Sequence, residues 1–195
     1  MGHIFFIILK FYIMSTIQNS KISNCLWFDN QAEQAAAYYT SIFKHSKLGK
    51  VARYGKEGHD IHKKPAGSVM TAEFWIEGQR FIALNGGPDF KFSESVSFVI
   101  NCDTQKEIDE YWEKLSHGGD KKAQACGWVK DKYGLSWQVV PTILGDLFAN
   151  DDREKTDRVM KAMLQMKKLD IAQLKQAFDG KEATSEKRKL SEPVH

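Results

Sequence analysis

Asp29-Asn30-Gln31-Ala32-Glu33 and Asp103-Thr104-Gln105-Lys106-Glu107 are two copies of one pattern within the same chain. Each copy lies between an apolar run and an amphipathic segment. The ends of the two copies also match, because Gly78–Leu84 aligns with Gly134–Val140. A repeat of this length indicates two similar supersecondary units packed against each other, and such a pair often forms a cleft in which small molecules bind.

The size and composition of the chain exclude several classes of protein. Its 195 residues are enough for one good-sized domain or two small modules. The 28 Lys and Arg residues are scattered among 25 Asp and Glu residues without a basic stripe, which argues against a nucleic-acid partner. Cys25, Cys102 and Cys126 form no C-x-x-C pair, which favours reduced thiols and a cytoplasmic location.

Both ends of the chain are expected to lie outside the fold. Residues 4–14 are strongly apolar but too short to span a bilayer, and they lack the basic start of a signal peptide. We therefore expect residues 1–20 to be an extension; the alternative is a weak export or membrane-association signal. Residues 181–195 are polar and charged, which predicts a disordered tail.

The first unit, about residues 21–88, predicts the order β-α-β-β-β. A mostly apolar strand over residues 22–28 comes first. Asn30 then caps a helix, with Glu33 three residues later as in a capping box. The helix carries an apolar stripe at helical spacing. The remaining strands are expected over residues 49–54, 68–76 and 80–84.

The second unit, about residues 94–141, repeats this order. Thr104 caps its helix, again with Glu107 at the third position. After Pro141 the chain turns helical, and Asp170 is expected to cap the last helix within residues 142–180. The strands of this unit are expected over residues 95–102, near 121–125, within 123–130 and over 135–140. They are apolar on both faces, which is typical of strands covered on both sides.

Several phrases resemble one family of proteins. They are Leu26-Trp27-Phe28-Asp29, Gly67-Ser68-Val69-Met70, Ala83-Leu84-Asn85-Gly86-Gly87-Pro88, Cys126-Gly127-Trp128, Trp137-Gln138-Val139-Val140-Pro141 and Val159-Met160-Lys161-Ala162-Met163-Leu164. With the paired units, they make the chain resemble the PhnB-like subgroup of the vicinal oxygen chelate (glyoxalase/bleomycin-resistance-like) superfamily. The resemblance implies an α+β fold: two βαβββ modules forming an open eight-stranded glyoxalase-type barrel, plus C-terminal helices, in a homodimer.

The metal-dependent members of this superfamily hold their ion with His and Glu on the first and last strand of each unit. By the repeat, those positions fall at Asn24 and Phe98 on the first strands and at Ile82 and Gln138 on the last. None is a strong ligand for a divalent ion, so we expect no metal site and no cofactor. A shift of one residue would bring Cys25 onto the position of Asn24.

Glu73 is the candidate catalytic residue. Strand alternation places it on one face with Thr71 and Trp75. If that face is the interior, Glu73 is a candidate acid, base or ligand anchor. If it pairs with Arg80 on the next strand, the pair is structural, and if it faces outward it is a surface charge. The candidate ligand-binding residues are Asn24, Thr71, Glu73, Ile82, Phe98 and Gln138.

These observations lead us to expect a cytoplasmic homodimer that binds a small organic ligand in its barrel cleft without a metal. One alternative is a metal-dependent lyase, isomerase or dioxygenase of the vicinal oxygen chelate type. Another is a protein-interaction module that uses the C-terminal helices. The subgroup often carries a demethylubiquinone methyltransferase label, but neither predicted helix follows the glycine-rich turn that a nucleotide-type cofactor usually needs. Whether the protein is an enzyme stays open.

Overall fold

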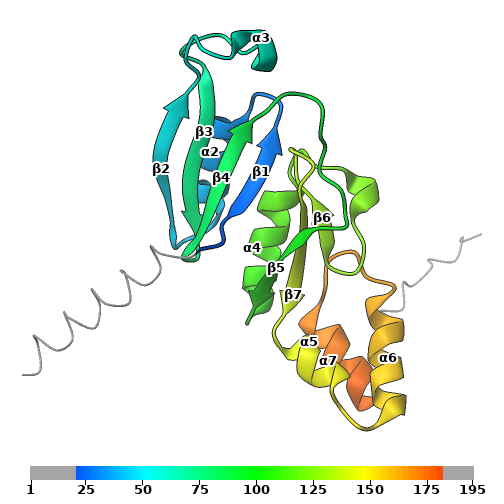
Figure 1. Cartoon of the computed structure of the whole chain (residues 1–195). Coiled ribbons are helices and arrows are strands. Elements are labelled where there is room, and N and C mark those ends of the chain that lie inside the picture. Colours follow the sequence, from blue (N-terminus) through cyan, green and yellow to red (C-terminus); the bar gives the residue numbers. More distant parts are fainter. Residues whose placement is uncertain (1–20, 182–195) are drawn as a thin grey trace, which may run out of the picture. The chain divides into compact units, whose positions relative to one another are not determined.

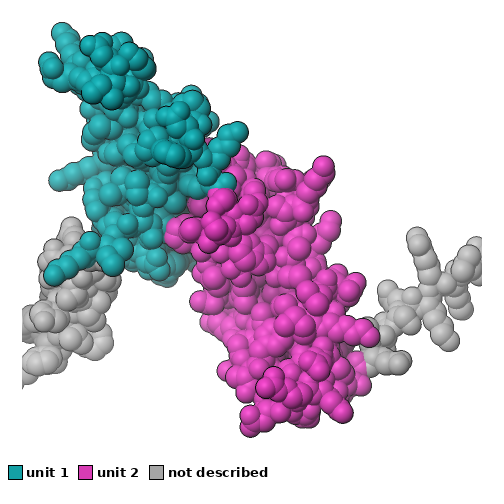
Figure 2. Space-filling model, turned by 45° about the vertical axis from the view of Figure 1, so that its right-hand side comes forward, with its two compact units in different colours: residues 1–92 teal, residues 93–195 magenta. Residues whose placement is uncertain are grey.

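A computed structural model describes residues 21–181, which fall into two compact units (Figure 2). The first unit belongs to residues 1–92 and the second to residues 93–195. The predicted extension over residues 1–20 lies outside the described residues, as does the tail beyond residue 181. Within residues 21–181, no helix is long and apolar enough to cross a membrane.

The first unit is a four-stranded sheet with a helix against one face (Figure 1). Its elements are β1 (Asn24–Phe28), α2 (Ala32–Ile42), β2 (Ser46–Arg53), α3 (His59–His62), β3 (Val69–Ile76) and β4 (Gln79–Asn85). The strand order is β1-β4-β3-β2. β1 runs parallel to β4, and the other neighbours are antiparallel. This is the predicted β-α-β-β-β unit, with the short helix α3 added in the loop.

Small residues let α2 lie close to its sheet. The buried residues of the helix are Ala32, Ala35, Ala36, Tyr39 and Ile42. Beneath them, the Phe74 ring stacks on Tyr39 at 5.9 Å between centroids and on Phe81 at 5.1 Å. The core of the first unit therefore lies between α2 and one face of the sheet.

The N-terminus of α2 differs from the prediction. The N-cap residue is Gln31, and its side chain makes no capping hydrogen bond, so the capping box predicted at Asn30 is wrong. Instead, the backbone N–H of Ala32 donates to Oδ1 of Asn85 at 2.8 Å. A buried amide at the end of β4 thus replaces the local cap, because it satisfies a helix N–H that has no partner within the helix.

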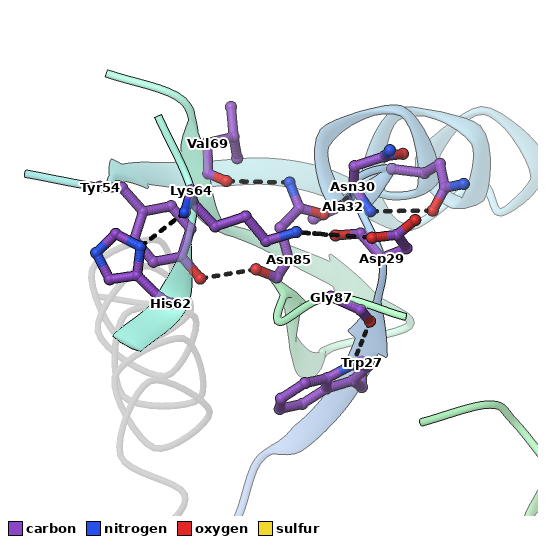
Figure 3. A network of polar contacts seen from close by, with 11 residues as sticks. Trp27, Asp29, Asn30, Ala32, Tyr54, His62, Lys64, Val69, Asn85 and Gly87 are labelled. Atoms are coloured by element: carbon purple, nitrogen blue, oxygen red, sulfur yellow. Dashed lines mark hydrogen bonds and ion pairs between the residues drawn. The ribbon is translucent and has the colours of Figure 1, made fainter. Parts of the chain in front are cut away.

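Asn85 ties four elements together at this point (Figure 3). Its Nδ2 donates to the carbonyl of Val69 at the start of β3, at 3.0 Å. Its own carbonyl accepts a hydrogen bond from the Tyr54 hydroxyl, just after β2, at 2.7 Å. Only 5% of Asn85 is exposed, so these bonds supply the partners that its largely buried amide and carbonyl need.

The second unit has a three-stranded sheet and five helical segments (Figure 1). Its elements are β5 (Ser97–Cys102), α4 (Gln105–Ser116), the 3₁₀ helix η1 (Lys121–Ala123), β6 (Trp128–Lys130), β7 (Ser136–Pro141), α5 (Ile143–Phe148), α6 (Arg153–Met163) and α7 (Ile171–Asp179). The strand order is β5-β7-β6, with β5 parallel to β7. The capping box predicted at Thr104 is confirmed, since the Thr104 side chain and Glu107 bond each other's backbone N–H.

The strand expected near residues 121–125 is replaced by η1. The Asp120 carboxylate accepts the N–H of Lys122 at 2.9 Å and so stabilises a turn. Cys126 and Gly127 then take positive φ angles of 51° and 86°, which interrupt extended backbone. The α+β class and the two related modules are confirmed, but residues 21–181 form two open sheets of four and three strands rather than eight strands, and neither sheet closes into a barrel.

The C-terminal helices have a small core of their own within the second unit. Three fully buried residues form this core: Val159 of α6, Leu169 in the segment before α7, and Leu174 of α7. The predicted cap of α7 is confirmed, because the Asp170 carboxylate accepts the N–H of Gln173 at 2.8 Å. Outside this core, Met160 of α6 and Leu164, the C-cap residue of that helix, are 41% and 59% exposed.

A buried carboxylate organises the turn between β6 and β7. Oδ1 of Asp131 accepts the N–H groups of Tyr133 and Leu135 at 2.8 and 3.1 Å. Its Oδ2 accepts Nε1–H of Trp137 at 2.8 Å. Asp131 is only 2% exposed. A buried charge is tolerated here because donors surround both of its oxygens.

Replacing Asp131 with Ala should lower the free energy of unfolding by about 3 kcal/mol, because two buried donors and one part-buried donor lose their acceptor at once. Urea unfolding monitored by circular dichroism measures the change. Asp157→Ala is the matched control, because Asp157 is exposed on α6, and it should change stability by less than about 0.5 kcal/mol. Equal effects of the two variants would contradict this account of the turn.

Candidate functional site

Strand alternation gives the first sheet a second face, which points away from α2. We call it the open face. Its members on β1, β3 and β4 are Cys25, Trp27, Thr71, Glu73, Trp75, Arg80, Ile82 and Leu84. The register arranges them in rows: Cys25 pairs with Ile82, which pairs with Glu73. Cys25 is exposed and the other seven are half-buried, so the face is neither a sealed core nor an ordinary polar surface.

An ion pair lies on the open face. The Glu73 carboxylate pairs with the Arg80 guanidinium, and Arg80 also donates from Nη1 to the Ser23 hydroxyl at 3.2 Å. The side chains of Glu73 and Arg80 are 23% and 35% exposed. The pairing of Glu73 with Arg80 was one of the alternatives that the sequence left open. The pair retains contact with solvent on this face.

Two indole rings flank the open face, each laid against a glycine. A Cβ at Gly49 of β2 would overlap the Trp75 ring, and one at Gly86 would overlap the Trp27 ring. Trp27 also donates from Nε1 to the carbonyl of Gly87 at 2.8 Å (Figure 3). Because both rings lean toward glycine, they leave the middle of the face to smaller side chains.

Cys25 is the one exposed thiol among residues 21–181. Partial desolvation raises the pKa of the Cys25 thiol, so its neutral form is favoured near pH 7. Cys102 lies under α4, where burial and the nearby Glu107 and Asp103 carboxylates raise its pKa to about 12. Neither thiol has the lowered pKa of a catalytic nucleophile.

The second sheet has an equivalent face, away from α4. Gln138 of β7 lies on it and donates from Nε2 to the Ser97 hydroxyl at 2.9 Å. Phe98 does not share this face. It pairs in register with the buried Trp137, and their rings are 5.5 Å apart on the side covered by α4.

The structure therefore brings together only part of the predicted ligand-binding set. Thr71, Glu73 and Ile82 share the open face of the first sheet, whereas Asn24 pairs with the buried Phe81 on the side of α2. On both first strands the residue that faces away from the helix is the next one along, Cys25 or Val99. In the first sheet Cys25 lies beside Ile82, and in the second sheet Val99 lies beside Gln138. These are the positions that a shift of one residue along each first strand gives.

Sequence reasoning missed Trp27 and Arg80 as members of the open face. A signal for Trp27 was present, because it alternates with Leu26 and Phe28, which are buried. Arg80 was considered only as a partner for Glu73. Among residues 21–181, no group of three or more His, Cys, Asp or Glu side chains is close enough to hold a metal ion.

Apart from the open face, the first unit has a small pocket of about 330 Å³ beside the N-terminus of α2. Asn30, Lys64, Ser68 and Asn85 contribute to its wall. The Lys64 ammonium donates to the Asp29 carbonyl at 2.9 Å and lies 3.6 Å from its carboxylate (Figure 3). The cation of this pocket is therefore already neutralised by a protein group.

Neither helix N-terminus suits the phosphates of a nucleotide-type cofactor. The turns before α2 and α4 contain no glycine. Backbone N–H groups that would face a phosphate are already bonded: Ala32 to Asn85 and Glu107 to Thr104. A phosphate site at a helix N-terminus needs such groups unoccupied, so these turns do not fit a cofactor of that kind.

Comparison with known proteins agrees with this architecture. The family model described as 3-demethylubiquinone-9 3-methyltransferase matches residues 20–140. A solved structure described as a putative 3-demethylubiquinone-9 3-methyltransferase, PhnB protein, from Bacillus cereus is 32% identical, with a TM-score of 0.53, and the match covers 63% of this chain and 99% of that one. None of the curated proteins matches the chain significantly.

Two further solved structures match a similar share of this chain but have lower TM-scores. A protein from Staphylococcus aureus is 28% identical, with a TM-score of 0.27, over 61% of this chain and 93% of that one. Protein PA1353 from Pseudomonas aeruginosa is 19% identical, with a TM-score of 0.48, over 63% and 98%. The family model matches residues 20–140, which hold both sheets, and this decides the assignment: the chain belongs to the 3-demethylubiquinone-9 3-methyltransferase family, whose members include PhnB-like proteins.

Proposed function

We propose that this protein binds a small organic ligand on the open face of the first sheet, without a metal ion. The observation that carries the proposal is the Glu73–Arg80 pair, half-buried on a sheet face that no helix within residues 21–92 covers. Small-molecule sites combine mostly apolar walls with a few placed polar groups. The open face has this composition, with Ile82 and Leu84 beside the pair.

The residues suggest which kind of ligand would bind. Arg80 offers a guanidinium to a carboxylate or carbonyl oxygen, and Glu73 offers a carboxylate to a hydroxyl or amine. Trp27 and Trp75 offer aromatic surface on either side. A ligand of matching chemistry has a planar or apolar body and one polar group that both accepts and donates hydrogen bonds.

Methyl transfer is not part of the proposal. The family description names that activity, but the helix N-termini of this chain do not fit a nucleotide-type cofactor. A metal-dependent lyase, isomerase or dioxygenase stays an alternative, because its site in the superfamily draws on both units. The cytoplasmic location and the homodimer stay predictions, as does an interaction role for the exposed Met160 and Leu164 of the C-terminal helices.

Cys25 provides a direct test of ligand binding, because its exposed thiol shares a row with Ile82 and Glu73. A fragment library is first screened by tryptophan fluorescence and thermal shift. A compound that binds should slow alkylation of Cys25 by N-ethylmaleimide by about tenfold or more at saturation, measured by peptide mass spectrometry. Cys126, in the second unit, is the internal control and should react at an unchanged rate.

If the hits leave the alkylation rate of Cys25 unchanged, the ligand binds elsewhere and the open face is not the site. The alkylation rate of Cys25 should keep rising at pH values above the pKa of an ordinary thiol, because burial raises the pKa of Cys25. Cys102 should react only after unfolding, because it is fully buried and its pKa is about 12.

Glu73→Gln separates a ligand-binding pair from a purely structural one. Because the pair is partly exposed, the substitution should lower the free energy of unfolding by only about 1 kcal/mol, against about 3–5 kcal/mol for a fully buried pair. It should nevertheless weaken binding of each hit that protects Cys25. Urea unfolding and fluorescence titration measure the two effects. Glu113→Gln, on the exposed surface of α4, is the control for both.

A loss of stability near 3–5 kcal/mol with unchanged ligand affinity would make the pair structural. The double-mutant cycle of Glu73→Gln with Arg80→Gln then isolates the coupling between the two side chains from their other contacts.

Elemental analysis tests the metal-dependent alternative. Protein purified without a metal-binding tag should contain far less than one equivalent of Zn, Ni, Mn or Fe, because Cys25, Ile82, Val99 and Gln138 form no ligand set for these ions. A stoichiometric metal that is lost in Gln138→Ala would favour the enzyme over the binding protein.

A further inference from the structure

A groove of about 420 Å³ lies between α6 and α7 in the second unit. Its polar lining comes from both helices and the residues that follow them: Arg158, Lys161, Gln165, Gln173, Gln176 and Lys181. The other lining residues are two alanines and one glycine. Among residues 21–181, the lining therefore contains three cationic side chains and three amides, and no carboxylate.

Arg158 is held rigidly at the edge of this groove. Its Nε donates to the carbonyl of Ala177 at 2.9 Å, and its Nη2 donates to the carbonyl of Phe178 at 2.8 Å. These carbonyls belong to the last turn of α7, and that of Ala177 also accepts the N–H of the C-cap residue Gly180 at 3.2 Å. The guanidinium is fixed by these two bonds, and its Nη1 has no hydrogen-bond partner within residues 21–181.

The other donors of the groove are also available. In the described part of the chain, Lys161 forms no ion pair, and the side-chain amides of Gln165 and Gln176 form no hydrogen bond. Lys181 pairs with Asp179 at 3.2 Å, but both side chains are at least half exposed, so the pair is weak and exchangeable. Three positive charges thus surround the groove, and within residues 21–181 only Lys181 has an acidic partner, Asp179, which lies outside the lining.

We propose that the α6–α7 groove binds a small organic anion with two or more negative charges, from the class of di- and tricarboxylates or phosphate esters. The volume lies within the range of small-molecule sites. Arg158 supplies a preorganised donor, which reduces the entropy lost on binding. Lys161 and Lys181 supply charge, and the glutamine amides hydrogen-bond to the oxygens of the anion. This site is separate from the open face and does not depend on its function.

The proposal is tested by titrating the full ¹⁵N-labelled chain with citrate and, separately, with pyrophosphate at constant ionic strength. The side-chain amide signals of Gln165, Gln173 and Gln176 should shift together, with a Kd of about 1 mM or lower for at least one of the two anions. Citrate alone would indicate a carboxylate site, and pyrophosphate alone a phosphate site.

Two variants with the same change of charge show whether binding is local. Lys161→Gln removes a cation from the groove and should weaken binding about fivefold or more. Lys175→Gln removes a cation from α7 outside the groove and should weaken it less than about twofold. The proposal is overturned if neither anion shifts the three amide signals up to about 10 mM. It is equally overturned if the two variants weaken binding alike, because the attraction would then be the general charge of the helices.

Discussion

The packing of α2 on its sheet is the constraint on which the first unit depends. Ala35 and Ala36 allow the helix to lie close to the sheet, and Tyr39 reaches down to stack on Phe74. Because one helix covers one face, every strand divides into residues that form the core and residues that form the open face. The placement of Glu73, Arg80 and Ile82 together follows from this division rather than from any local motif.

The phrases that carry the resemblance to PhnB-like proteins have clear structural roles in this chain. Asn85 caps α2 and bonds β3, Gly86 leaves room for the Trp27 ring, and Gly87 accepts the indole N–H. In the second unit, Cys126 and Gly127 bond the segment between α6 and α7 through the carbonyls of Met166 and Lys167. These residues hold the fold together, so sharing them identifies the family without identifying a reaction.

Much of the fold could be predicted from the sequence, because the signals were local. The repeated order of elements, the Thr104 capping box and the Asp170 cap each depend on residues within a few positions of one another. The cap of α2 could not be predicted, since it comes from Asn85, far along the chain. The burial of the Asp131 carboxylate was not predicted either, because a polar turn sequence does not show whether its side chains are buried.

The candidate site was predicted only in part, and the error has one physical cause. A displacement of one residue along a strand moves a side chain to the opposite face. The repeat aligned Asn24 with Phe98, and both lie on the helix side of their sheets, whereas Cys25 and Val99 lie on the other. Thr71, Glu73 and Ile82 were placed together because the β3–β4 hairpin determines their register by a short turn.

The central claim is that small organic ligands bind to the open face of the first sheet and not to the sheet of the second unit. Fluorine NMR of the chain labelled with 5-fluorotryptophan tests this most directly, because the five tryptophans report on different faces. With a bound compound, the account predicts that the signals of Trp27 and Trp75 shift while that of the buried Trp137 stays in place. A compound that binds and shifts Trp137 or Trp112 while leaving Trp27 and Trp75 unchanged would contradict it.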